Sequence, residues 1–234
     1  MATRMDRKDL LERYEATGDE AAYLEALPLY EQAARNGADP GTLQDYGYLL
    51  ECHARRLLRR AVELYERAIE LDPDLDKPRY QLISARAGLQ EPELPIAEYE
   101  KKLEAAPDQI RWHRLLARAY LSAHDYDRAR KVVDRGLALE PDDPMLIECR
   151  AEVRTGKGDA EGALSDWRRA LELDPDHIGP LYMSAFLLER IGRRQEAMDN
   201  WRAIIDWSES RGYELDTIWP KQELERLKRR QSAF

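Results

Sequence analysis

One segment, residues 110–177, carries the same pattern twice, with the second copy 34 residues after the first. Small, bulky and proline positions recur at this separation: Ala129 and Ala163, Val133 and Trp167, Gly136 and Ala170, Pro141 and Pro175. A unit of this length is too short to bury an apolar face by itself, so it has to stack on further copies. The period therefore predicts a repeat array.

Helical periodicity and turn residues extend the array in both directions. Each unit reads as two helices joined by a turn, so the sequence predicts six helical hairpins, at about residues 6–36, 41–72, 76–106, 110–140, 144–174 and 178–208. In the second hairpin the repeat residues of the first helix stand two positions early relative to those of the second helix. This offset predicts a longer turn around residues 52–56. Together these hairpins form an all-α array over residues 1–211.

Residues 212–234 are predicted to form a C-terminal capping helix with a basic tail. The apolar residues of this helix can cover the last hairpin: Ile218, Trp219, Leu224 and Leu227. A polar outer face on such a helix keeps a repeat array soluble.

Composition excludes several classes of protein. Thirty-seven Lys and Arg against 46 Asp and Glu give a net charge of −9, which opposes binding to nucleic acid and to anionic membranes. No apolar run approaches a membrane span, and the N-terminal residues lack a signal-peptide core, so we expect a cytoplasmic protein. Cys52 and Cys149 stand far apart and predict two buried, reduced thiols rather than a disulfide framework.

The small and bulky positions resemble those of the tetratricopeptide repeat, in which the eighth, twentieth and twenty-seventh residues are small and the thirty-second is proline. Residues 110–207 carry the resemblance strongly, and residues 1–40 and 76–95 weakly. The resemblance implies a right-handed superhelical solenoid whose first helices line a concave groove, usually occupied by a peptide or another protein.

Helix periodicity places a set of side chains on the groove side of the first helices. In the central hairpins these are Arg111, Arg114, Arg118, Glu148, Glu152, Tyr182 and Phe186, and in the earlier hairpins they include Gln44, Tyr48 and Gln81. The three arginines form a basic stripe in an acidic protein. They predict binding of carboxylate or phosphate groups of a partner, because guanidinium forms paired hydrogen bonds with such anions.

Two alternatives compete with this interpretation. Arg114 can pair with Glu148 and Arg118 with Glu152 across neighbouring helices, as surface salt bridges of little energetic weight. Tyr182 and Phe186 are either an exposed apolar binding patch or the surface that the C-terminal helix covers. The sequence leaves both alternatives open.

The sequence lacks the residues by which other proteins bind chaperone tails or metals or catalyse reactions. Some tetratricopeptide proteins hold the C-terminal carboxylate of heat-shock chaperones through Lys and Asn, and the corresponding positions here do not match. The four histidines fall in different hairpins without a metal-ligand spacing, and no nucleophile or phosphate-binding motif occurs. We therefore expect no metal, no cofactor and no catalytic residues.

The sequence predicts a non-enzymatic adaptor or scaffold that holds a protein or peptide partner in its groove, with acidic or C-terminal carboxylate groups on the partner. Two other functions stay open. One is a structural scaffold that self-assembles, and the other is a regulatory subunit of a separate enzyme.

Overall fold

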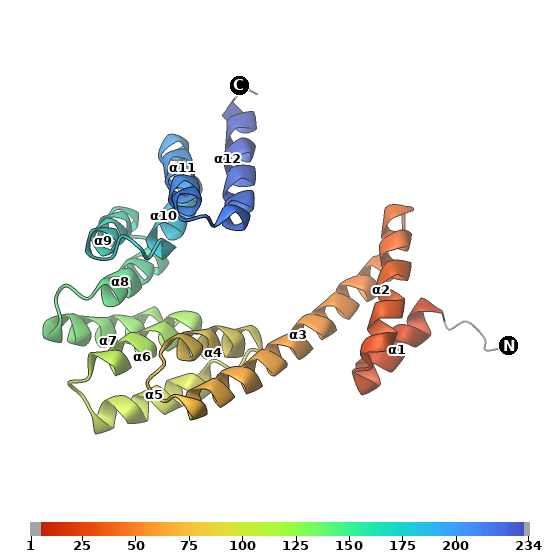
Figure 1. Cartoon of the computed structure of the whole chain (residues 1–234), viewed down its shortest axis with the longest axis horizontal. Helices are drawn as coiled ribbons and strands as arrows, with labels where there is room; N and C mark the ends of the chain where they lie inside the picture. The colour runs from red at the N-terminus through yellow and green to blue at the C-terminus, as the bar shows by residue number, and fades with distance from the viewer. Residues whose placement is uncertain (1–5, 232–234) are drawn as a thin grey trace. The chain divides into compact units, whose positions relative to one another are not determined.

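The computed structural model of the chain describes residues 6–231, and within that range every regular element is helical. The α-helices, labelled in Figure 1, are α1 (Arg7–Thr17), α2 (Glu20–Arg35), α3 (Pro40–Leu71), α4 (Lys77–Gly88), α5 (Glu93–Ala105), α6 (Ile110–Ser122), α7 (Tyr126–Leu139), α8 (Pro144–Gly156), α9 (Ala160–Leu173), α10 (Gly179–Arg190), α11 (Arg194–Ser210) and α12 (Ile218–Gln231). A 3-10 helix, η1 (Glu214–Thr217), precedes α12. The predicted all-α fold is confirmed. The last three residues of the predicted capping segment, 232–234, lie outside the described range.

The chain divides into two compact units, residues 1–92 and 93–234. The first unit holds α1 to α4, and the second holds α5 to α12. Helices α4 and α5, the two halves of the predicted third hairpin, belong to different units. In the second unit each helix packs against its neighbour in sequence, and α6 also packs against α8.

Aspartates begin most of the helices, and residues with a left-handed backbone end the turns between helices. Asp19, Asp125 and Asp159 accept hydrogen bonds from the first-turn amides of α2, α7 and α9. The turns before these helices contain Gly18, His124 and Gly158, whose φ angles are 70°, 58° and 83°. His124 thus takes the place that glycine holds in the neighbouring repeat.

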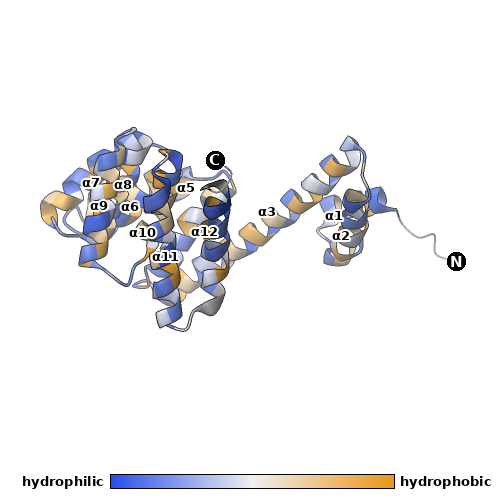
Figure 2. Cartoon of the chain, turned by 90° about the horizontal axis from the view of Figure 1, so that it is seen from above, coloured by the Kyte–Doolittle hydropathy of each residue, from blue (hydrophilic) through white to orange (hydrophobic). Residues whose placement is uncertain are grey.

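The predicted hairpin at 41–72 is wrong, because α3 is one uninterrupted helix of 32 residues. The stretch where the turn was expected, ECHARRLLRR over 51–60, contains no Gly, Pro, Asp or Asn. Its residues are mostly good helix formers, and none readily takes the left-handed conformation that closes the other turns. Hydrophobic residues recur along the exposed surface of this helix (Figure 2).

The small residues of the repeat mark places where helices approach closely. Ala129, Ala163 and Ala197 are fully buried, as are the bulky Trp167 and Trp201 that stand four residues after the last two. Gly136 stands at such a place, since a Cβ atom there would lie 2.5 Å from Leu146 Cδ1 and 3.0 Å from His113 Cβ. Helices α6, α7 and α8 therefore meet at a point where a larger residue would force the Leu146 side chain to move.

Candidate functional site

The first helices of the second unit, α6, α8 and α10, carry seven of the ten residues predicted for the groove. We call the surface formed by these residues and their direct contacts the first-helix face. It has a charged part on α6 and α8 and an aromatic part on α10.

Arg114 of α6 is held by two carboxylates. Its Nε donates to Asp143 Oδ2 at 2.6 Å, and a terminal nitrogen lies 3.5 Å from Glu140 Oε2. The Asp143 side chain is fully buried and also caps α8 by accepting from the Leu146 amide at 2.8 Å. The sequence offered Glu148 as an alternative partner of Arg114, and the structure places the fixed carboxylate of the capping Asp143 beside this arginine.

Arg118, one turn further along α6, bridges two glutamates of α8. It donates to Glu152, as predicted, and a second guanidinium nitrogen lies 3.4 Å from Glu148 Oε1. Burial raises the pKa of the Glu152 carboxyl, an effect that Arg118 offsets only in part. Burial also raises the pKa of the neighbouring Cys149 thiol to about 12, so this thiol stays protonated at neutral pH.

His177, in the loop before α10, completes the charged part of the face. Its Nε2 lies 2.7 Å from Glu148 Oε2, and this hydrogen bond raises the pKa of the imidazole. Burial alone would raise the pKa of Glu148, but the hydrogen bonds from His177 and Arg118 outweigh it and lower that pKa. Glu148 is therefore a buried carboxylate held between two donors.

The charged part carries four carboxylates, three arginines and the imidazole of His177. Arg114 and Arg118 face four carboxylates, those of Glu140, Asp143, Glu148 and Glu152. Arg111, the third arginine of the predicted stripe, places its guanidinium 5.1 Å from the ring centroid of Trp112. An anion approaching Arg114 or Arg118 would thus compete with carboxylates already in place.

The aromatic part joins α10 to the C-terminal helix. Tyr182 and Phe186 lie against Trp219 at the start of α12, with ring centroids 5.9 Å and 5.5 Å apart, and both rings also contact the buried Trp201. Phe186 keeps 44% of its surface exposed and Trp219 keeps 43%. The C-terminal helix covers Tyr182 in part and enlarges the exposed aromatic surface at the same time.

Helix α12 is fixed by apolar and charged contacts. Leu224 and Leu227 are buried, as predicted for a cap, whereas Ile218 is 53% exposed. Arg226 bonds to Glu189 of α10, and Lys221 Nζ lies 2.7 Å from Glu209 Oε1 of α11.

The three remaining predicted residues lie in the first unit. Gln44 and Tyr48 are exposed on α3, and Gln81 is exposed on α4. The Tyr48 hydroxyl donates to Glu15 Oε1 at 2.6 Å, and this bond raises the pKa of the phenol. These residues are therefore not part of the first-helix face.

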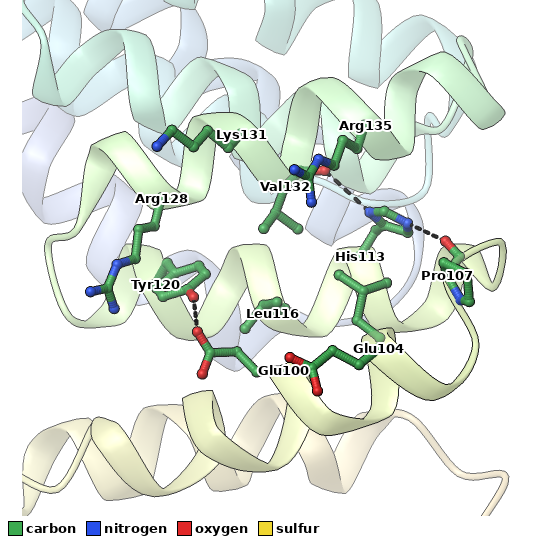
Figure 3. Close-up of a pocket in the computed structure, with 11 residues that line it drawn as sticks. Glu100, Glu104, Pro107, His113, Leu116, Tyr120, Arg128, Lys131, Val132 and Arg135 are labelled. Atoms are coloured by element: carbon green, nitrogen blue, oxygen red, sulfur yellow. Dashed lines mark hydrogen bonds between the residues drawn. The ribbon is translucent and has the colours of Figure 1, made fainter.

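A cavity of about 470 Å³ opens between α5, α6 and α7 (Figure 3). Carboxylates of α5, such as Glu104, and basic side chains of α7, such as Lys131, line it together. Three of its polar side chains already have partners, since Tyr120 donates to Glu100 and the His113 ring nitrogens lie 2.8 Å and 3.3 Å from the carbonyl oxygens of Pro107 and Val132. The cavity lacks the exposed aromatic groups of the first-helix face.

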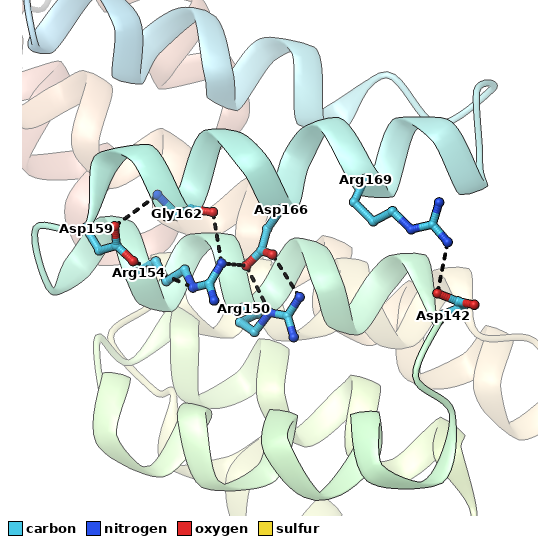
Figure 4. Close-up of polar contacts among 7 residues, drawn as sticks. All are labelled: Asp142, Arg150, Arg154, Asp159, Gly162, Asp166 and Arg169. Carbon is cyan, nitrogen blue, oxygen red and sulfur yellow. Dashed lines mark hydrogen bonds and ion pairs between the residues drawn. The ribbon is translucent and has the colours of Figure 1, made fainter.

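A charged network holds α8 to α9 (Figure 4). Arg150 makes two hydrogen bonds of 2.9 Å and 2.8 Å to the carboxylate of Asp166, and Arg154 lies 2.7 Å from the same group. Asp166 is nearly buried, whereas Asp142, which pairs with Arg169 at 3.0 Å, is 71% exposed. The network fixes the helix whose groove side carries Glu148 and Glu152.

Sequence reasoning missed several participants in the face, among them Asp143 and His177. Asp143 stands just before Pro144, which is a helix-start signal that could have placed its carboxylate at the end of α8. His177 follows the repeat's proline, in a loop that helix periodicity does not describe. Among residues 6–231, no three His, Cys, Asp or Glu side chains come together as a metal site, and no helix combines the length and apolarity needed to cross a bilayer.

Comparison with known proteins agrees with the repeat. A tetratricopeptide repeat family model matches residues 96–151. The chain is 33% identical over 86 residues to cellulose synthase 1 operon protein C of Komagataeibacter xylinus, covering 37% of this chain and 6% of that protein. It is 24% identical over 201 residues to a DnaJ homolog subfamily C member 7 homolog of Schizosaccharomyces pombe, covering 74% and 41%. The chain thus spans less than half the length of these curated relatives.

Solved structures support the same fold. A thermophilic tetratricopeptide protein of Thermus thermophilus superposes with a TM-score of 0.58 at 18% identity, covering 76% of this chain and 98% of that one. A tetratricopeptide repeat protein of Parabacteroides merdae gives a TM-score of 0.50 at 15% identity, covering 94% and 93%. At these identities the likeness concerns the fold alone.

Proposed function

Since this chain is a tetratricopeptide-repeat protein, we propose that it acts as a non-enzymatic adaptor that holds a segment of a partner protein on the first-helix face of its second unit. The repeat fold generally mediates protein–protein interactions. In this chain the first-helix face would bind the partner, and the side chains of that face would set the partner's chemistry. The chain itself would not catalyse a reaction.

The observation that carries the proposal is the pair of exposed aromatic rings at the end of the face. Phe186 and Trp219 touch each other, and each leaves more than two fifths of its surface open. Large aromatic side chains in such a position are enriched among residues that dominate binding energy. An apolar side chain of the partner is the group that this pair fits.

The charges beside the aromatic pair indicate a second requirement. Arg114 and Arg118 are already paired with four carboxylates there, so an acidic side chain of the partner gains less binding energy than a Lys or Arg side chain. The acidic partner expected from the sequence has to displace Asp143 from Arg114, or Glu152 from Arg118. We therefore propose a partner segment with an apolar anchor and a basic residue nearby.

Selection from a random peptide library tests both requirements. Peptides enriched by the intact protein should share an apolar residue and a neighbouring Lys or Arg, and selection with Phe186→Ala should lose that motif. The matched control is Leu139→Ala, which removes a side chain of α7 with the same 44% exposure. Enrichment of acidic peptides would overturn the basic-partner proposal, and an unchanged motif with Phe186→Ala would overturn the proposed face.

A further inference from the structure

Helix α3 carries a row of exposed leucines, which bears on the self-association that the sequence left open. Leucine occurs at every seventh residue of this helix, at positions 43, 50, 57, 64 and 71. All five side chains are exposed, by 49%, 40%, 58%, 56% and 72%. A seven-residue spacing keeps side chains on one side of a helix, so the leucines form a stripe. It is about 42 Å long at a rise of 1.5 Å per residue.

The rest of the first unit packs on other sides of α3. At about 100° per residue, the buried Leu49, in the cluster with α1 and α2, lies about 80° to one side of Leu57. Leu58, which packs in the cluster with α4, lies about 100° to the other side. The neighbouring helices thus flank the leucine stripe without covering it.

Small residues next to the leucines allow another helix to approach. Ala54, Ala61 and Ala68 each stand four residues after a leucine of the stripe. Alternating Leu and Ala at this spacing over three heptads is the pattern of a helix that pairs with a second helix, each leucine fitting between side chains of its neighbour.

The leucine positions fit a second copy of α3 running in the opposite direction. With a two-fold axis at Leu57, residue 43 of one copy lies opposite residue 71 of the other, residue 50 lies opposite residue 64, and the two copies of Leu57 meet. Every leucine then faces a leucine. The apolar surface of 43–50, which the sequence predicted to pack on the second half of a hairpin, then packs on that half from the other chain.

The direction follows from the repeat pattern of α3. The predicted hairpin would have packed its first half on its second half in the antiparallel sense, and only an antiparallel pair reproduces that contact between two copies. Arg60 and Arg67 each stand three residues after a leucine and therefore border the stripe. In the antiparallel pair the two copies of Arg67 are about 30 Å apart along the axis and the two copies of Arg60 about 9 Å apart.

We propose that α3 is a homodimer interface in which two copies of the chain pair antiparallel through the leucine stripe. In this interface the N-terminal half of α3 in one chain packs on the C-terminal half of α3 in the other chain. It is separate from the first-helix face, so dimerisation presents two such faces in one assembly.

Sedimentation equilibrium of the full chain tests the interface. We expect a dimer whose dissociation constant rises at least ~10-fold with Leu57→Lys, because that substitution places two like charges together at the two-fold axis. Leu24→Lys is the matched control, since Leu24 is a 62% exposed leucine of α2 outside the stripe. It should leave the dimer intact. Circular dichroism of both variants checks that they stay folded.

A monomeric wild-type chain at 100 μM, set as about the highest working concentration, would overturn the proposal, as would a dimer that Leu57→Lys leaves unchanged. Disulfide trapping with Cys52→Ser as background then tests direction. Leu50→Cys mixed with Leu64→Cys should form a disulfide-linked dimer, whereas Leu50→Cys alone should not. Trapping of Leu50→Cys with itself would contradict the antiparallel arrangement.

Discussion

The ring of Trp219 stacks on the ring of Tyr182, with centroids 5.9 Å apart and planes inclined by 10°. This contact ties the start of α12 to α10 at the aromatic end of the first-helix face. The same helix therefore serves as a cap for Tyr182 and as a source of exposed aromatic surface beside Phe186. The sequence presented these two roles as alternatives.

Trp219→Ala should lower the free energy of unfolding by about 1–3 kcal/mol, because it removes contacts with three aromatic rings. The adjacent Ile218→Ala is the control, since Ile218 is largely exposed and its loss should cost less than about 0.5 kcal/mol. Chemical denaturation of the two variants measures the difference. Equal stability of the two variants would mean that Trp219 does not hold α12.

Stability should depend on pH through His177 and Glu148. The pKa of His177 is raised in the folded protein. Its contribution to the free energy of unfolding is therefore fully present below its ordinary pKa of 6.5 and is lost as the pH rises through the raised value. The contribution of Glu148, whose pKa is lowered, is present above its ordinary pKa of 4.5 and is lost as the pH falls through the lowered value. The pair therefore stabilises the fold most between pH 4.5 and 6.5.

Thermal unfolding of the wild type and His177→Gln checks this dependence. The gap in Tm should be larger at pH 5.5 than at pH 8.5, by about 1–2 °C, because Glu148 is buried but His177 is about half-exposed. His124→Asn, a change in an exposed turn that asparagine tolerates, should follow the wild-type profile. A gap that is constant with pH would show that the imidazole charge plays no part.

Asp166→Asn should destabilise the second unit by about 1–3 kcal/mol, because it removes the charge that two arginines share at a nearly buried site. We expect less than the full cost of a broken buried pair, since both arginines keep about a third of their surface exposed. Asp142→Asn breaks the exposed pair with Arg169 and should change stability by less than about 1 kcal/mol. Equal denaturant midpoints for Asp166→Asn and Asp142→Asn would contradict the stabilising role of the Asp166 carboxylate.

Gly136→Ala should destabilise by about 1–3 kcal/mol although alanine is the better helix former, because the added Cβ would meet Leu146. In a Leu146→Ala background the same change should cost less, since its nearest obstacle is gone. A double-mutant cycle by denaturant unfolding measures this coupling. Additive costs would mean that the close approach to Leu146 is unimportant.

Much of the fold could be predicted from the sequence because each turn has a local chemical signal. Gly158, Gly192 and even His124 adopt the left-handed backbone at equivalent positions. The same reasoning failed at α3, where the repeat spacing suggested a turn and the residues themselves supply none. Local helix propensity prevailed over the repeat period there, and that outcome could have been read from the absence of turn residues.

The candidate site was less predictable because periodicity gives the face of a residue and not its partner. Arg118 met Glu152 as expected, but Arg114 turned to the capping Asp143. Such choices depend on side-chain reach between helices, which the sequence spacing does not fix. Trp219 contributes to the face only because the C-terminal helix folds back on α10.

Site-specific photocrosslinking tests the central claim most directly. Phe186 is replaced by p-benzoylphenylalanine in the full-length protein, and Leu139 is replaced in a parallel sample. We predict that a peptide chosen by library selection crosslinks at position 186 and not at position 139. Crosslinking at 139 alone, or at neither position while the peptide binds, would contradict partner binding on the first-helix face.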